Sequence, residues 1–501
     1  MTDNKKKTTP SGVVAYHNVD DAYLEQRTLR KGAGWVLLWA MGVGAVISGD
    51  YFGWNLGLAA GGFGGLAVAT LLMATMYVCM VFTIAELSTA LPHAGGFYSF
   101  VRNAMGPSAG YVCGLTDTIE YVITPAVVVY AIGGYVNKLI FGEAPAPVFL
   151  QYVWWMIAYV VFVYVNIRSV ELTLKFALFI TGIALIVLIT FYGAVIWSGA
   201  FDPQLLLNVP VTSPNGSSQF PNGYAGIFFA LPAAIWFYLA IEQLPLAAEE
   251  AHDAVKDMPR ALFASIITLL ALSLFTLVLN SGVGGGAVVI GASQAPLNDG
   301  FAAVWGDGWL TKLFTFLALA GLVASFHSII YAYGRVLFSL SRAGYYPRWI
   351  SVVNRHHAPQ TALILGAVIG FGCAVVIANF ETAAVGGALL FMAVFGAVIS
   401  YILVMISYIV LKIRRPNLPR PYVSPLGIPG AVVGALLSLV AMIACFSNPE
   451  YRPALYGTLI FLACGIGYYL LYSRKRLVSR APEEEIALLA AAENELKSSE
   501  S

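Results

Sequence analysis

The sequence predicts an all-α integral membrane protein with twelve membrane-spanning helices, on two observations. First, 59% of the 501 residues are apolar and only 11% are charged, a composition unlike that of ordinary soluble domains. Second, a helix needs about 20 predominantly apolar residues to cross a bilayer. Twelve such stretches follow one another, at roughly 35–58, 64–88, 109–136, 149–167, 174–198, 224–246, 260–282, 311–338, 361–379, 386–412, 429–447 and 454–473.

The basic residues orient these spans, since lysine and arginine are retained on the cytoplasmic side in short loops. If the N-terminus is cytoplasmic, only Lys138, Lys312 and Arg452 of the 27 basic residues fall on the outer side. All others lie in the tails, the inner loops or the inner ends of spans. We therefore expect an integral protein of the cytoplasmic membrane with both termini cytoplasmic.

Both tails are expected to be short and cytoplasmic. Residues 1–33 contain three consecutive lysines but no apolar core or cleavage site of their own, so a removable signal peptide is not expected. Residues 474–501 contain three consecutive glutamates at 483–485 and a short apolar run, which is typical of a frayed helix or a disordered tail. A net charge of +1 gives no reason to expect a nucleic-acid partner.

Cofactor and enzyme signatures fail on context. The five cysteines are scattered through predicted spans without the paired spacing of metal ligands, so no metal or cofactor is expected. The glycines at 284–286 lack the strand and the lysine of a nucleotide-binding loop. No catalytic serine or cysteine arrangement can be placed, and an enzyme is therefore not expected.

The first span carries an acid at membrane depth. Asp50 lies in the run Gly42-Val-Gly-Ala-Val-Ile-Ser-Gly-Asp-Tyr-Phe-Gly53, in which four of twelve residues are glycine. A carboxylate at the bilayer centre costs at least ~2.5 kcal/mol, and it persists only beside a cavity, a partner or a cation. Because glycine also weakens a helix, we expect span one to be interrupted here.

The sixth span has the same character. Pro232 and Pro245 interrupt it around Glu242, and glycine- or proline-broken helices at corresponding positions of two halves are the best sequence indication of a transporter site at the bilayer midplane. This pattern divides the chain into a first half at 34–198, an outer loop at 199–223, a second half at 224–412 and two further spans within 429–473.

A broken helix frees amides and carbonyls to replace the water stripped from a polar substrate. Free amides at Ser48 and Gly49 would accept an anionic group, whereas carbonyls and the Asp50 carboxylate would favour an ammonium group. Structural alternatives stay open, with Asp50 as a buried, hydrogen-bonded acid and the two small residues as helix packing.

Several motifs resemble the amino acid, polyamine and organocation transporter superfamily over essentially all twelve spans. The matching segments are Ala85-Glu-Leu-Ser-Thr-Ala-Leu-Pro92 with Gly95-Gly96-Phe-Tyr98, Ala248-Glu-Glu250 with Asp257-Met-Pro259-Arg260, and Gly334-Arg335-Val-Leu-Phe-Ser-Leu-Ser-Arg342-Ala-Gly344. Within the superfamily the chain is most similar to bacterial ethanolamine permeases, on Gly49-Asp-Tyr-Phe-Gly-Trp-Asn55, Ile119-Glu-Tyr-Val-Ile-Thr-Pro125 and Ala234-Ile-Trp-Phe-Tyr-Leu-Ala-Ile-Glu242.

The resemblance implies a leucine-transporter-type fold, in which five helices are repeated in inverted topology and two peripheral helices follow. It also implies a central site between spans one, three, six and eight. Amino acid carriers of the superfamily usually have an apolar residue where this chain has Asp50, which would repel a carboxylate and attract an amine. We therefore expect a secondary permease that imports ethanolamine or a similar small organic amine by alternating access, with an amino acid permease or exchanger as the alternative.

The resemblance assigns nine residues to the substrate site. Trp236 matches an aromatic gate that would offer an ammonium a cation–π face worth ~0.5–2 kcal/mol, although core or interfacial packing is the alternative. Glu242 would either coordinate the amine or bind a proton. The nine residues are Ser48, Gly49, Asp50, Tyr51, Trp236, Phe237, Glu242, Ser325 and Phe326.

Five further residues are candidates for gating and coupling. Asp117, Glu120 and Tyr121 on span three are expected to line the inner vestibule, or to cap helix ends. His327 on span eight can titrate near physiological pH, and Lys175 matches a lysine that replaces sodium in the superfamily, so protons are the coupling ion considered. The alternatives are a satisfied core histidine and a lysine that extends to the membrane surface.

Overall fold

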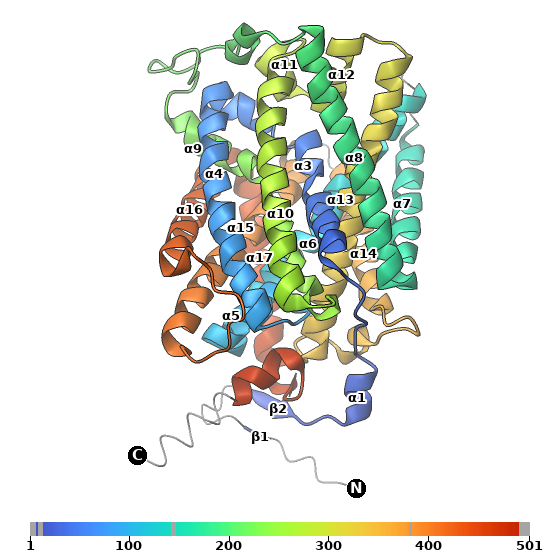
Figure 1. Ribbon diagram of the computed structural model, residues 1–501, viewed down its shortest axis with the longest axis vertical. Coiled ribbons are helices and arrows are strands. Elements are labelled where there is room, and N and C mark those ends of the chain that lie inside the picture. The colour runs from blue at the N-terminus through green and yellow to red at the C-terminus, as the bar shows by residue number, and fades with distance from the viewer. Residues whose placement is uncertain (1–6, 9–13, 142–146, 380–382, 490–501) are drawn as a thin grey trace.

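The computed structural model describes residues 7–8, 14–141, 147–379 and 383–489, which form a bundle of helices (Figure 1). Ten helices in this part of the chain are long and apolar enough to cross a membrane. The first and sixth predicted spans form shorter apolar helices, Trp35–Tyr51 and Ala225–Ile235, as interrupted helices would. Parts of both predicted tails, at 1–6, 9–13 and 490–501, lie outside the described residues.

The first half of the chain follows the predicted spans with two differences. The predicted first span ends early, since its last residues begin the next helix, which bends at Gly62 where φ is +66°. A short helix that the sequence analysis did not predict, α5, follows that helix. The helices are α1 (Asp21–Glu25), α2 (Trp35–Val46), α3 (Ser48–Tyr51), α4 (Leu56–Ala90), α5 (Gly96–Met105), α6 (Pro107–Phe141), α7 (Val148–Arg168) and α8 (Val170–Ser198).

The second half begins with a short 3₁₀ turn, η1 (Pro203–Leu207), in the predicted outer loop. It adds two unpredicted helices, α11 and α12, between the seventh and eighth spans. Its elements are α9 (Ala225–Ile235), η2 (Ile241–Glu250), α10 (Ala254–Phe275), η3 (Thr276–Asn280), α11 (Gly286–Ala292), α12 (Pro296–Trp305), α13 (Trp309–Arg342), η4 (Arg348–Ser351), α14 (Gln360–Asn379), α15 (Ala383–Arg414), α16 (Gly427–Ser447), η5 (Pro449–Tyr451), α17 (Arg452–Leu471) and η6 (Ser473–Lys475).

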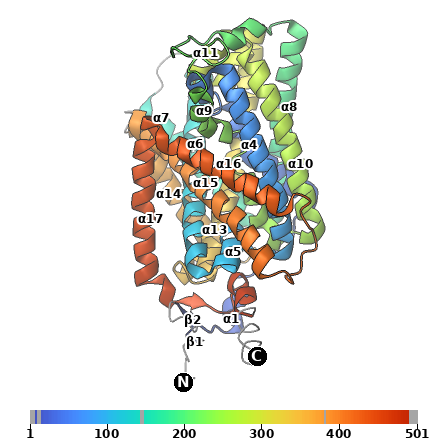
Figure 2. The ribbon, with the colours of Figure 1, turned by 90° about the vertical axis from the view of Figure 1, so that its left-hand side faces the viewer.

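A small sheet lies at one end of the bundle, beside α1 (Figures 1 and 2). Its strands are β1 (Lys7–Thr8), β2 (Ala15–His17) and β3 (Leu477–Val478), and β2 pairs antiparallel with β1 and parallel with β3. We call this the tail end of the bundle. The opposite end, which we call the far end, carries α11 and α12.

The C-terminal tail is ordered, contrary to the frayed or disordered segment that its composition predicts. After β3 the backbone is helical at 482–489, and the side chains of Glu483 and Glu484 are fully buried. Glu484 forms an ion pair with Arg102 of α5, and Glu483 forms one with Arg342 of α13, each at 2.6 Å. Partners on distant elements therefore order a segment that would be too polar to fold alone.

Large apolar side chains remain exposed on the outer surface of the bundle. Examples are Val160 on α7, Ile186 on α8 and Ile460 on α17, which are 59%, 66% and 65% exposed. Such extensive apolar exposure marks a membrane-contacting surface. The polar groups described below lie inside this apolar shell.

Candidate functional site

The two interrupted helices are in direct backbone contact. A Cβ atom built on Gly49 of α3 would lie 1.8 Å from the carbonyl oxygen of Trp236, so only glycine fits at this approach. Gly53 faces the ring of the same tryptophan, 3.1 Å from its nearest atom, and has φ of +92°. The glycines that predicted a broken first span thus also let the sixth span approach it.

Aromatic rings from both interruptions stack on one another. Trp236 packs against Phe52 with ring centroids 5.9 Å apart, and Phe237 stacks on Trp54 at 5.4 Å. Both Trp236 and Phe237 are buried. The structure therefore brings the predicted gate residue to the first span, between the two helix interruptions.

Asp50 points toward the seventh span. It is 1% exposed, its Oδ1 accepts a hydrogen bond of 3.0 Å from Thr276 Oγ1, and its Oδ2 has no hydrogen-bond partner among the described residues. Thr276 opens η3, a π-helical turn of the kind that is frequent at functional sites, and also bonds with the Tyr192 hydroxyl at 2.6 Å. No sequence signal marked Thr276, because its importance lies in a contact with another element.

Ser48 and Ser325 meet, as the resemblance implied. The Ser48 hydroxyl donates to Ser325 Oγ at 2.9 Å, and Ser325 Oγ donates to the carbonyl of Ala45 at 2.6 Å. Tyr51 donates from its hydroxyl to the carbonyl of Ala184 on α8. Phe326 lies elsewhere: its ring makes edge contacts with Tyr159 and Phe162 of α7.

Three buried acids gather beside the second interruption. Glu242 of η2 accepts hydrogen bonds at Oε1 from the Tyr401 hydroxyl and from the Ala240 amide, the latter at 3.0 Å. Glu120 of α6 is in hydrogen-bonding contact with Glu242. One turn away on α6, Asp117 accepts from Ser400 at 2.6 Å.

These contacts change the expected placement of the span-three residues. Glu120 reaches Glu242 directly, so it belongs to the group of acids around the sixth-span interruption and not only to a vestibule below it. Tyr121 is buried next to it on α6. Sequence reasoning missed Ser400 and Tyr401 of α15, since span ten carries no motif that distinguishes them.

His327 does not reach either interruption. Its Nδ1 bonds with the Asn166 side chain at 3.1 Å and its Nε2 with the carbonyl of Thr173 at 3.0 Å, and its ring packs against Phe176. Both ring nitrogens are thus satisfied within the packing of α7, α8 and α13. The arrangement is that of a core histidine, which was the alternative interpretation.

Lys175 also lies away from the site. Its side chain is 64% exposed and forms an ion pair of 2.6 Å with Glu171, one turn earlier on α8. It therefore does not occupy the sodium-replacing position that the resemblance implied. The flanking sequence departs from the usual spacing, and the structure places the ammonium group on the outer surface of the bundle.

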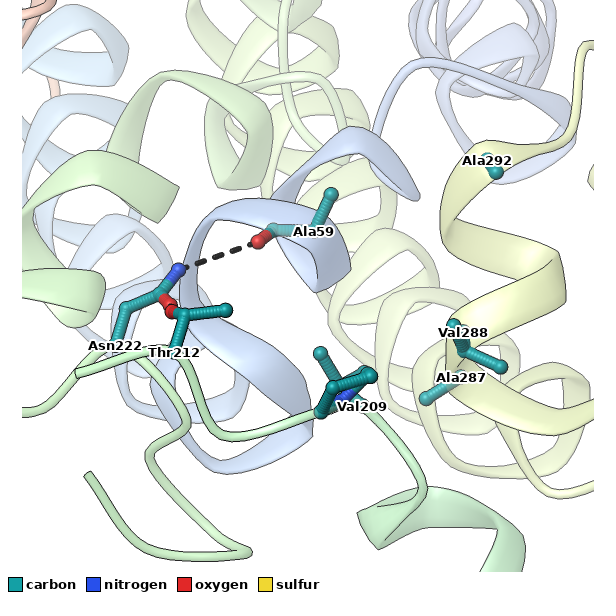
Figure 3. Close-up of a pocket in the computed structure, with 8 residues that line it drawn as sticks. Ala59, Val209, Thr212, Asn222, Ala287, Val288 and Ala292 are labelled. Atoms are coloured by element: carbon teal, nitrogen blue, oxygen red, sulfur yellow. Dashed lines mark hydrogen bonds between the residues drawn. The ribbon is translucent and has the colours of Figure 1, made fainter.

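A cavity of about 390 Å³ lies toward the far end, where the 199–223 loop meets α4 and α11 (Figure 3). The Asn222 amide donates to the carbonyl of Ala59 at 3.3 Å and so ties the loop to the first turns of α4. The cavity is lined by Ala59, Val209, Pro210, Thr212, Asn222, Ala287, Val288 and Ala292. It lies close in sequence to the end of the first interruption, but none of the predicted site residues lines it.

The chain matches known membrane transporters over most of its length. Residues 34–470 match the family model described as amino acid permease. A branched-chain amino acid permease of Bacillus subtilis is 22% identical over 90% of this chain and 94% of its own. L-asparagine permease 1 of Mycobacterium bovis is 25% identical over 92% and 94%, and an uncharacterized transporter of Rhizobium meliloti is 28% identical over 65% and 69%.

Proposed function

This chain belongs to the amino acid permease family, and we propose that it is a secondary transporter that imports a small organic amine, with ethanolamine as the reference substrate. Members of the family and the matched relatives are permeases, so the chain is a transporter and not an enzyme. The proposed site lies between the interrupted first and sixth spans. Transport proceeds by alternating access, with protons as the proposed coupling ion.

In this proposal the protein lies in the cytoplasmic membrane with both tails inside the cell. The halves 34–198 and 224–412 form an inverted pair joined by the outer loop 199–223, and the spans within 429–473 are peripheral. The tail end then faces the cytoplasm, and the cavity at the far end faces outward. Support for this orientation comes from the distribution of basic residues, which are retained on the cytoplasmic side.

One observation carries the choice of an amine: the acids beside the interruptions lack cationic partners. Asp50, Glu120 and Glu242 are each 1% exposed, and each has a carboxyl oxygen without a hydrogen-bond partner in the described part of the chain. Arg335 and Arg342, which are also buried, pair instead with other glutamates. A region of uncompensated negative charge attracts an ammonium group and repels a carboxylate.

Aromatic residues supply the second half of an amine site. Trp236, Phe52 and Phe237 pack at the interruptions, and an aromatic face attracts a cation by about 0.5–2 kcal/mol, depending on desolvation. In the proposal Trp236 covers the site and must move for substrate to pass. Ser48 and the Gly49 backbone provide the polar lining.

The alternative is an amino acid permease, which the printed names of the relatives favour. Such a substrate would place its carboxylate at the free amides of Ser48 and Gly49, next to Asp50 in sequence. This arrangement requires Asp50 to be neutral or screened, since two like charges at short range repel strongly in a low-dielectric site. The hydrogen bond from Thr276 is compatible with either substrate.

Thermal unfolding of the purified full-length protein tests the proposal. A ligand that binds only the folded state stabilises it by about 2.7 kcal/mol at one hundred times its dissociation constant. Ethanolamine, choline, 4-aminobutyrate, alanine and arginine are compared side by side. Stabilisation by ethanolamine, alone or with choline, supports the amine site, whereas stabilisation only by the amino acids would put the alternative in its place.

A further inference from the structure

We propose that Glu120 and Glu242 bind a single proton between them and form the proton-coupling site of the transporter. The inference rests on the proposed function, and it replaces the coupling pair, His327 and Lys175, that the resemblance implied. Both of those residues have other partners, and neither lies at an interrupted helix.

The two carboxyl groups meet across two elements. Glu120 projects from the continuous helix α6, while Glu242 is the second residue of η2, directly after the interruption of the sixth span. They are in hydrogen-bonding contact with each other. No other described donor reaches either oxygen of Glu120 or the Oε2 atom of Glu242.

That contact requires a proton. An ionised carboxylate only accepts hydrogen bonds, so two ionised groups would face each other without a donor and repel. One shared proton turns the pair into an O–H···O⁻ hydrogen bond and leaves a single negative charge. The Tyr401 hydroxyl and the Ala240 amide donate to Oε1 of Glu242, which stabilises that remaining charge.

The surroundings offer no competing cation. The titratable groups packed around the pair are acids, a thiol and phenols from α4, α6, the sixth-span interruption and α15. None of the described lysines, arginines or histidines donates a hydrogen bond to either carboxyl. The surrounding groups are Tyr77, Cys113, Asp117, Tyr121, Tyr238 and Tyr401.

The backbone at the interruption holds Glu242 in place at a conformational cost. Ala240 adopts φ of +84°, a left-handed conformation that costs a residue with a side chain about 1–2 kcal/mol, and this conformation directs its amide to Glu242. Strained residues of this kind cluster at binding and switch regions. When η2 moves relative to α6 during alternating access, the two carboxyls separate and the shared proton is released.

Infrared difference spectroscopy tests proton binding without any substrate. The C=O stretch of a protonated buried carboxyl in the full-length protein near neutral pH should disappear in both Glu120→Gln and Glu242→Gln. Asp202→Asn, at an exposed cap of η1, should leave it unchanged. The Tyr401→Phe variant should shift the band, since it removes a donor from the pair. Persistence of an unshifted wild-type band in all three site variants, or loss of the band on adding sodium, would overturn the proton assignment.

Transport in proteoliposomes then separates this inference from the proposed function. With a substrate chosen from the stabilisation panel, a proton gradient should drive accumulation by the wild type, and Glu120→Gln should lose this accumulation while still exchanging labelled for unlabelled substrate. Accumulation by Glu120→Gln that still follows the proton gradient would overturn the coupling site. If the panel instead identifies an amino acid, the amine proposal fails and the coupling measurement is made with that amino acid.

Discussion

Asp50 is the residue on which substrate choice depends. Its Oδ2 atom is buried without a partner in the described residues, while Oδ1 is held by Thr276. We expect Asp50→Asn to keep the fold, since the amide oxygen can still accept that bond, and to abolish stabilisation by ethanolamine. Asp117→Asn is the matched control, because Asp117 is a buried acid satisfied by Ser400. An unchanged dissociation constant in folded Asp50→Asn protein would defeat the assignment.

Gly49 sets the distance between the two interrupted helices. An added methyl group would lie 1.8 Å from the Trp236 carbonyl oxygen, so Gly49→Ala must push the backbones apart. Overpacking of this kind costs about 1–3 kcal/mol, and we expect a lower unfolding temperature and loss of transport. Gly193→Ala on α8 is the control, since its methyl group meets nothing within 4 Å. Equal behaviour of the two variants would contradict the close approach.

Trp236 is expected to act on rate more than on affinity. It is 2% exposed and packs on Phe52 and Gly53, so it must move when the site opens. If it is a gate, Trp236→Ala should slow substrate exchange in proteoliposomes more than it weakens binding in the thermal assay. The conservative variant Trp236→Phe should restore most of the rate. Equal losses of rate and affinity would leave Trp236 as a binding residue only.

At the scale of elements, the interruption between α9 and η2 stores backbone strain at Ala240. Glycine adopts a positive φ without this cost, so Ala240→Gly should raise the stability of the resting protein by up to about 1 kcal/mol. The same exchange at Ala194, within the regular helix α8, should lower stability by about 0.5–1 kcal/mol. Thermal unfolding of the two variants checks the opposite signs, and a loss of stability in both would remove the strain argument.

The elements themselves differ in how far local sequence predicts them. Long apolar helices such as α8 and α13 were predicted to within a few residues, because length and apolar content are local properties. The short helices α5, α11 and α12 were missed, since each is too short to span a bilayer and depends on packing at the ends of the bundle. The π-helical turn η3 was also missed, although it holds Asp50.

At the scale of the whole molecule, the C-terminal tail ties the tail end of the bundle together. Arg342 of α13 pairs with Glu249 of η2 and Glu483 of the tail, each at 2.6 Å. Burial alone would raise the pKa of Glu249, but the Arg342 guanidinium lowers it below its ordinary value. Because η2 also carries Glu242, this network links the tail to the proposed coupling site.

Breaking the buried ion pair between Glu484 and Arg102 should therefore destabilise the protein. Removing one partner of a buried pair leaves an uncompensated charge and costs about 3–5 kcal/mol, so we expect a large fall in the unfolding temperature of Glu484→Gln. Asp21→Asn removes an exposed pair with Arg480 on the same surface and should cost at most about 1 kcal/mol. Similar unfolding temperatures for the two variants would mean that the tail does not contribute to the fold.

The sequence by itself determined the membrane class, the positions of most long helices and the two places where helices are interrupted, because apolar length, glycine and proline act locally. Asp50, Glu242, Trp236 and the pair Ser48 and Ser325 were selected correctly as residues near those interruptions. Only the tertiary structure decided which groups meet: Glu120 with Glu242, Asp50 with Thr276, and the tail glutamates with arginines of α5 and α13. It also placed His327 and Lys175 away from the site. Contacts between elements far apart in the chain depend on how the helices pack, and no local pattern encodes them.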